Sequence, residues 1–269
     1  MKPNYTILFS LFRLGCWIIG LTTLSFCAFS QEEDPPEGGH TLALQFGVNQ
    51  IKDENLHSKA STGTITQFSY GFEMIKKVWH QFHFTLGYSR LKTEFEDLSK
   101  SVNLTLHTGY SWNYPLVRKN RFNYYLGPEG NIAYNVSYFP NWDESHLYWA
   151  SNFSIGVRNS FSVEFKNETK WVSFISLPLF SMFSRPELYR LYKIDELDFG
   201  GIVSNLNRNL TPAHLANVFF VKFQTEYRFP VFKKKMQAFT YSLEYNRVKH
   251  SDSNIFVQLS HQIGIRLFL

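Results

Sequence analysis

Ten segments of the chain alternate between apolar and polar residues with a period of two, from Gly39 to the last residue. Successive side chains of a β-strand point to opposite faces, so this period predicts strands with one apolar and one polar face. In the clearest segment, Leu104 and Leu106 lie on one face and Thr105 on the other. The predicted strands lie at about 42–49, 67–74, 82–89, 102–113, 122–138, 152–165, 170–183, 219–229, 239–246 and 255–269.

The length and chemistry of these segments favour a membrane-spanning barrel over a soluble β-sandwich. Strands of about ten residues or more suit a tilted bilayer crossing, whereas soluble strands usually have about five or six residues. One face carries mainly Leu, Val and Phe, and the other Gly, Ser, Asn, Glu and Arg. A sheet inside a bilayer must close on itself, because an open edge leaves backbone groups unpaired. We therefore predict an all-β fold, a closed antiparallel transmembrane β-barrel of about ten strands, with eight or twelve as alternatives.

The composition agrees with this fold and argues against several others. The chain holds 27 Phe, is 18% aromatic, and has a mean hydropathy of −0.23. A single apolar stretch approaches the length of a transmembrane helix, which excludes a polytopic helical membrane protein. The net charge of +5 is spread evenly along the chain, so no nucleic-acid partner is expected.

The first thirty residues have the features of a secretory signal peptide. Lys2 and Arg13 precede an apolar stretch that ends in small residues, which predicts cleavage after Ser30. An uncleaved N-terminal anchor and a lipoprotein cleavage box at residues 24–27 are the alternatives. Both cysteines lie in this segment, so the mature chain would have no disulfide and no cysteine-ligated metal. The chain thus divides into a signal peptide, a short periplasmic segment and the barrel, over residues 1–30, 31–38 and 39–269.

The connections between the predicted strands alternate between short basic turns and longer polar loops. Lys76-Lys77 lies in one of the short turns. The longer loops lie at about 52–61, 92–101, 140–146, 184–216 and 247–253. Outer-membrane barrels have short periplasmic turns and longer extracellular loops. With an even number of strands, this alternation predicts that both termini are periplasmic and that the long loops face the cell exterior.

With these strands and turns, residues 39–269 resemble the small outer-membrane β-barrel proteins of Gram-negative bacteria. In that family the last strand commonly ends in an aromatic residue that the barrel assembly machinery reads, and here Phe268 precedes the final Leu269. The junction at residues 30–31 resembles export signals of Bacteroidetes-type bacteria. The resemblance implies a location in the outer membrane and contact with lipid and lipopolysaccharide. It also implies the assembly machinery as a partner during insertion.

Charged residues on the polar faces predict what fills the lumen. An interior of eight to ten strands is roughly filled by side chains, whereas water-filled channels need about sixteen strands. Buried charges need partners, so we predict a hydrogen-bonded network; a selective path or ligand cavity is the alternative. His83 and His107 could face each other across neighbouring strands, but two ligands do not make a zinc site. The predicted lumen residues are Glu73, His83, His107, Glu129, Arg158, Glu164, Lys222, Glu226, Arg228, Glu244 and Arg266.

Evidence for catalysis in the sequence is weak. His250, Ser251 and Ser253 lie in a segment similar to the His-x-Ser element of outer-membrane lipid A deacylases, where a histidine base activates a serine hydroxyl. Asp252 stands at the expected serine position. We therefore predict a polar hairpin tip and no enzyme, cofactor or metal, with a lipid-modifying hydrolase as the alternative.

The longest loop, over residues 184–216, is the main feature outside the barrel. Its apolar spacing over residues 188–197 admits a short amphipathic helix. Tyr189, Tyr192 and Phe199 are candidates for contact with a protein partner, lipopolysaccharide or a ligand, and a lid over the lumen is the other interpretation. We predict a structural or interaction barrel that acts through its extracellular loops. A hydrolase and a narrow transporter of a small apolar ligand remain the alternatives.

Overall fold

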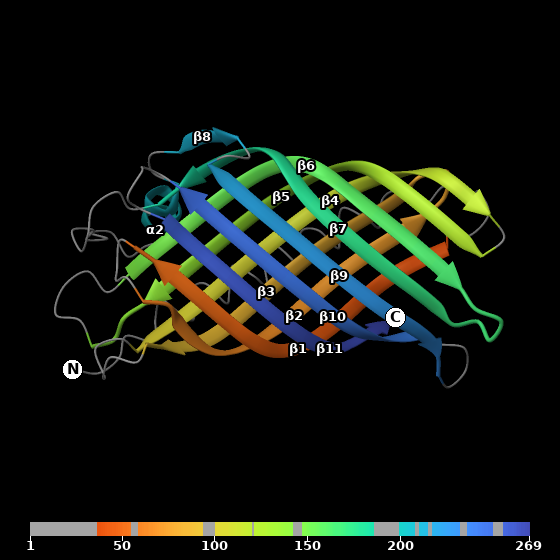
Figure 1. Ribbon diagram of the computed structural model, residues 1–269, viewed down its shortest axis with the longest axis horizontal. Coiled ribbons are helices and arrows are strands. Elements are labelled where there is room, and N and C mark those ends of the chain that lie inside the picture. The colour runs from red at the N-terminus through yellow and green to blue at the C-terminus, as the bar shows by residue number, and fades with distance from the viewer. Residues whose placement is uncertain are drawn as a thin grey trace.

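A computed structural model describes residues 37–54, 59–93, 100–119, 121–141, 147–185, 199–207, 210–214, 217–231, 236–249 and 255–269. Ten strands form one closed antiparallel barrel (Figure 1), as the alternation predicts. The ring closes because β6 pairs with β7, β7 with β9, and β11 with β1. Its strands are β1 (Glu37–Asp53), β2 (Ser61–Ile75), β3 (Trp79–Lys92), β4 (Ser101–Lys119), β5 (Phe122–Tyr138), β6 (Leu147–Glu164), β7 (Lys170–Ser184), β9 (Val218–Pro230), β10 (Met236–Lys249) and β11 (Ile255–Phe268).

The two ends of the barrel differ in the length of their connections. At one end, which we call the turn end, β1 begins, β11 ends and the short connections join the strands. The other end, which we call the loop end, carries the longer connections. The turn end lies on the right of Figure 1 and the loop end on the left. The connections alternate in length as predicted except between β10 and β11, where the five residues 250–254 equal the longest connections of the turn end.

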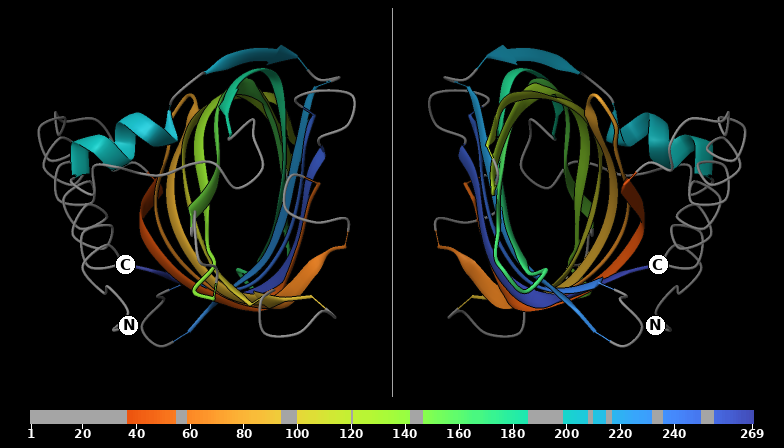
Figure 2. Two further views of the ribbon diagram at one scale, coloured as in Figure 1. Left: turned by 90° about the vertical axis from the view of Figure 1, so that its left-hand side faces the viewer. Right: turned by 90° about the vertical axis from the view of Figure 1, so that its right-hand side faces the viewer.

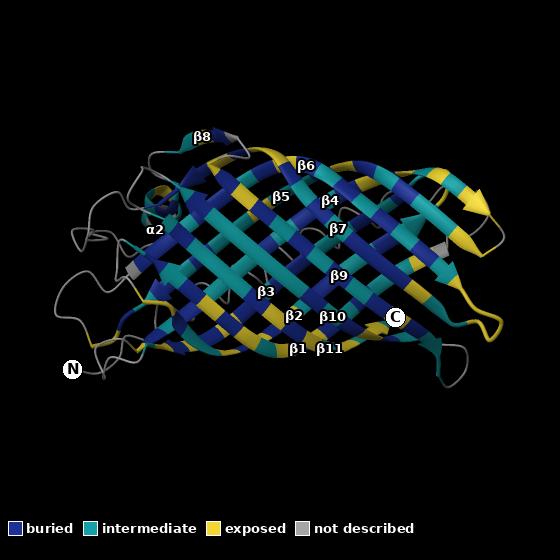
Figure 3. Ribbon diagram, in the orientation of Figure 1, coloured by how far each residue is buried: buried dark blue, intermediate teal, exposed yellow. Residues whose placement is uncertain are grey.

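Each strand presents alternating side chains to the lumen and to the exterior. Figure 3 shows this as a succession of buried and more exposed positions along the strands. Asn49, Ser89 and Asn103 are fully buried although they are polar, because they point into the lumen. The exterior instead exposes large apolar side chains, among them Leu44, Phe46, Phe68, Trp112, Ile132, Ile155, Phe180, Phe239, Ile263 and Ile265. An apolar exterior around a polar interior is the inverse of a soluble fold.

The strands contain two irregularities in register, neither of which is at Pro128. We predict from the sequence that Pro128 marks a bend or bulge, but β5 keeps its register there, with Pro128 opposite Val157. A proline removes one ladder hydrogen bond without requiring an extra residue. The shifts lie instead between Pro115 and Val117 of β4 and at the β6–β7 pairing beside Pro178.

The described part of the longest loop packs against the outside of the wall. Helix α2 (Phe199–Leu206) lies beside the ring in Figure 2. Leu206 packs on Trp149, with Tyr134 and Val136 next to it, and its carbonyl accepts a hydrogen bond of 2.6 Å from Ser151 Oγ. Strand β8 (Thr211–His214) pairs with the loop end of β7 and so extends the wall. The helix predicted over 188–197 lies outside the described residues.

No helix in the described part of the chain combines the length and the apolar character needed to cross a membrane.

Two glycines of β5 offer a matched test of how closely the strands approach each other. A Cβ added at Gly127 would lie 1.6 Å from the carbonyl oxygen of Trp112 on β4, whereas one added at Gly130 would meet nothing within 4 Å. We expect Gly127→Ala to destabilise the barrel by about 3 kcal/mol, because the backbone of β4 must move. Gly130→Ala is expected to leave stability unchanged or slightly raised.

Urea unfolding of both variants in lipid vesicles, followed by tryptophan fluorescence, measures the difference. Equal midpoints for Gly127→Ala and Gly130→Ala would show that β4 and β5 have more room between them than the structure gives.

Candidate functional site

The lumen contains a network of buried ion pairs centred on Glu226. Glu226, which is 1% exposed, accepts hydrogen bonds from Arg228 Nε at 2.9 Å and forms an ion pair with Arg266 at 2.6 Å. Arg228 also donates to both carboxylate oxygens of Glu73, at 2.8 and 3.3 Å. Because β2 and β9 stand on nearly opposite sides of the ring, the Glu73–Arg228 pair crosses the lumen.

Two more pairs join neighbouring strands and complete the charge balance. Arg158 of β6 donates to Glu129 of β5 at 2.7 Å, and Lys222 of β9 lies 2.9 Å from Glu244 of β10. Together with the pairs around Glu226, the network contains four cations and four carboxylates. An unpaired charge in such an interior would cost several kcal/mol, so the balance is a condition for a filled lumen.

His107 links this network to the opposite wall. Lys222 Nζ lies 3.2 Å from His107 Nδ1, and His107 Nε2 lies 3.2 Å from Asn131 Oδ1. An ammonium group can only donate, so Nδ1 accepts and Nε2 carries the ring proton. The ring of His83 lies beside that of His107, with centroids 4.8 Å apart, as the alternation of β3 and β4 suggests. The described residues contain no cluster of three or more His, Cys, Asp or Glu side chains suited to a metal ion.

The remaining predicted residues lie elsewhere. Glu164 is not part of the lumen network: its side chain is 47% exposed and pairs with Lys170 at 3.2 Å. It is the last residue of β6, at the rim where the chain leaves the barrel. Phe199 begins α2 on the outer wall. The catalytic candidates and the other loop candidates lie outside the described residues: His250, Ser251, Ser253, Tyr189 and Tyr192.

A closed ring of five hydrogen bonds between uncharged side chains, which we call the amide ring, lies nearer the loop end, and the sequence pattern does not single it out. Asn103 donates to Asn135 at 2.6 Å, and Asn135 donates to Gln258 at 2.8 Å. Gln258 donates to Asn49 at 3.2 Å, and Asn49 donates to Ser89 at 3.1 Å. Ser89 donates back to Asn103 at 3.4 Å. Each member therefore donates to the next, which satisfies the polar groups without any charge.

Four side-chain contacts cross the lumen between opposite or nearly opposite sides of the ring, and we call them the cross-lumen bridges. They tie the walls of the barrel together at four levels along its axis. From the loop end to the turn end, the bridges are Asp53–Arg185 at 2.6 Å, Asn135–Gln258 at 2.8 Å, His107–Lys222 at 3.2 Å and Glu73–Arg228 at 2.8 Å.

Inward-facing apolar side chains cluster at both ends of the lumen, and we call the two clusters the loop-end closure and the turn-end closure. The loop-end closure consists of Ile51, Leu91, Phe183, Ala213, Val218, Val248 and Phe256. The turn-end closure consists of Trp79, Tyr125, Val172 and Phe174, with Ile75 packed against them.

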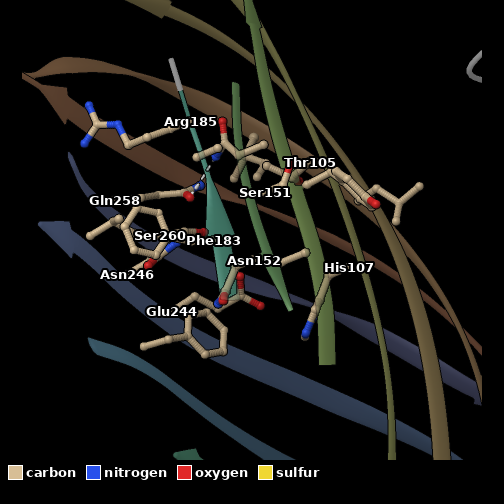
Figure 4. A pocket seen from close by; sticks show the side chains of 18 of the residues that line it. Thr105, His107, Ser151, Asn152, Phe183, Arg185, Glu244, Asn246, Gln258 and Ser260 are labelled. Atoms are coloured by element: carbon tan, nitrogen blue, oxygen red, sulfur yellow. Dashed lines mark hydrogen bonds between the residues drawn. The ribbon is translucent and has the colours of Figure 1, made fainter. Parts of the chain in front are cut away.

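Two small cavities lie between the two closures. One, of about 50 Å³, lies among His107, Asn135, Glu244 and Gln258 (Figure 4), and another, of about 40 Å³, lies beside Glu73. Spaces of this size hold one or a few water molecules.

The fold and its interior define a ten-stranded β-barrel with a filled and electrically balanced lumen. No protein-family profile and no curated protein sequence matches the chain. Several solved structures are similar to it in fold.

The outer membrane protease OmpT of Escherichia coli has a TM-score of 0.49 and 6% identity, over 89% of this chain and 99% of that protein. The β domain of the Bordetella autotransporter BrkA has a TM-score of 0.40 and 13% identity, over 87% and 100%. Neisserial surface protein A has a TM-score of 0.31 and 12% identity, over 86% and 97%. At these identities the activities of the three proteins have no bearing on this chain.

Proposed function

We propose that the protein spans the bacterial outer membrane as a closed, non-conducting barrel and acts in a structural or interaction role through its loop end. The set of cross-lumen bridges carries this proposal, because it leaves no bore for a solute. The exposed apolar side chains around the wall support the membrane location, since they would be unfavourable in water.

The proposed orientation places the turn end and both termini in the periplasm and the loop end outside the cell. The connections are on the whole shorter at the turn end than at the loop end, which supports this orientation. In this setting the expected contacts are membrane lipid and lipopolysaccharide around the wall, and the barrel assembly machinery during insertion. A protein partner would bind at the loops.

The two alternatives have less support. A transporter of a small apolar ligand would need a passage through a lumen that is bridged, charged and closed at both ends. For a hydrolase, a histidine must reach a serine hydroxyl. Among the histidines whose side chains the structure describes, the hydroxyl partners are tyrosines: His40 with Tyr70, His80 with Tyr110 and His261 with Tyr241.

Conductance is the direct test of the closed lumen. We expect the refolded protein, inserted into a planar bilayer, to give no stepwise current in neutral-pH salt solution. A sixteen-stranded porin inserted under the same conditions is the positive control. Regular current steps from the refolded barrel would refute the closed lumen and revive the transporter alternative.

A further inference from the structure

The hairpin between β4 and β5 extends beyond the end of β3 at the turn end, while β6 accompanies it on its other side. Strand β4 pairs with β3 only as far as Asn113, opposite Trp79, although β4 itself continues to Lys119. Six residues of β4 therefore have no β3 partner, a length of roughly 20 Å along the strand. The hairpin reaches the right-hand end of Figure 1.

The projecting part of this hairpin is apolar at its base. Tyr114 and Leu116 are 53% and 56% exposed and continue the outward apolar row of β4, which includes Trp112. Phe122, at the start of β5 beside the tip, is also exposed. Exposed aromatic and aliphatic side chains at the end of a lipid-facing wall are typical of the membrane interface.

The tip of the hairpin carries three exposed cations: Arg118, Lys119 and Arg121. Together with Phe122 they line one open hollow. Arg118 reaches the neighbouring turn, where it donates to the carbonyl oxygens of Lys76 and Lys77, at 3.4 Å each.

That contact brings two more exposed lysines beside the hairpin tip. Within the part of the chain that the structure describes, none of the three tip cations forms an ion pair. Glu164, whose backbone N–H bonds to the carbonyl of Arg121, directs its carboxylate to Lys170 instead.

We propose that the hairpin tip, defined by Arg118, Lys119, Arg121 and Phe122, binds the phosphate groups of anionic phospholipids in the leaflet at the turn end. The inference rests on the proposed membrane location. Its basis is the order of side chains along one strand, with apolar and aromatic groups at acyl-chain depth followed by unpaired cations at the depth of the headgroups. Unpaired cations beside an anionic membrane surface each strengthen the association, by about fivefold.

The test uses the full chain folded into nanodiscs of phosphatidylcholine and phosphatidylglycerol in equimolar amounts. Native mass spectrometry of the released protein measures which lipid it retains. We expect the unmodified barrel to retain phosphatidylglycerol in preference to phosphatidylcholine. In the variant R118Q/K119Q/R121Q the ratio of retained phosphatidylglycerol to phosphatidylcholine is expected to fall at least about tenfold. K170Q is the matched control, because it removes a cation at the same end that Glu164 already neutralises.

Two outcomes would overturn the hairpin site while leaving the proposed function intact. One is a triple variant that retains phosphatidylglycerol as the unmodified barrel does. The other is an equal loss in K170Q, which would assign the preference to the overall charge of the turn end. Heat-modifiability on SDS gels verifies that each variant is folded. An unmodified barrel that fails to insert into any bilayer would refute the proposed function itself, and the hairpin site with it.

Discussion

Replacing Glu226 with glutamine is expected to destabilise the folded barrel by about 3–5 kcal/mol, because the change leaves buried cations without a compensating charge. Arg266 would lose its carboxylate partner at 2.6 Å, and Arg228 would keep only Glu73. Glutamine has nearly the same shape, so the effect reports charge and not packing. Urea unfolding in lipid vesicles, monitored by tryptophan fluorescence, measures the loss.

Glu164→Gln is the matched control for this prediction. Glu164 also forms an ion pair with a basic residue, Lys170, but its side chain is 47% exposed. Exposed pairs contribute about 0–1 kcal/mol, so this variant is expected to unfold close to the unmodified barrel.

A second variant separates charge from a general effect of mutation at this site. Adding Arg266→Met to Glu226→Gln removes one of the buried cations that have lost their carboxylate partner, and it should recover part of the lost stability. Similar losses for Glu226→Gln and Glu164→Gln, or no recovery in the double variant, would contradict the balanced network.

The fold was predictable from the sequence because a barrel wall imposes one rule on every strand. Inward and outward positions alternate without interruption, so a segment such as 102–113 shows which face meets lipid before any partner strand is known. The alternation failed to locate the irregularities. Pro128 leaves the ladder in register, whereas the register shifts beside Pro115 and Pro178, and the apolar–polar pattern is of the same kind at all three.

Apart from Glu164, the charged residues of the lumen network could be predicted from the sequence, but the partner of each residue could not. The polar faces of the strands place Glu73 and Arg228 inside the barrel, but which residues meet across it depends on strand tilt and stagger. The amide ring carries the same alternating signal, since Asn103 and Asn135 both lie on polar faces. A buried charge requires an oppositely charged partner, whereas an uncharged amide can bond to many kinds of polar group. Nothing in the sequence therefore distinguishes the residues of this ring from other polar residues that face the lumen.

The two apolar closures could not be predicted, because the sequence does not show whether an aromatic residue at the end of a strand faces inward or outward. Trp79 and Phe256 point inward at the ends of strands, where a polar residue would continue the alternation. In the sequence they look like the aromatic residues of the exterior girdles. The three-dimensional structure shows that these side chains turn into the lumen.

Trp79→Ala is expected to destabilise the barrel by about 3–5 kcal/mol, the usual cost of removing a large buried aromatic side chain. Trp79 is 1% exposed, and its ring lies 5.1 Å from that of Tyr125 and 5.6 Å from that of Phe174, between centroids. Its indole nitrogen has no hydrogen-bond partner among the described residues, so the loss reports packing.

Trp112→Ala is the control, since Trp112 stands on the neighbouring strand, faces outward and is 43% exposed. Lipid fills the space it vacates, so the expected loss is clearly smaller. The barrel carrying Trp79→Ala should still conduct no current in a planar bilayer, because the cross-lumen bridges lie beyond the turn-end closure. Current through this variant would show that Trp79 and its neighbours, and not the bridges, keep the lumen shut.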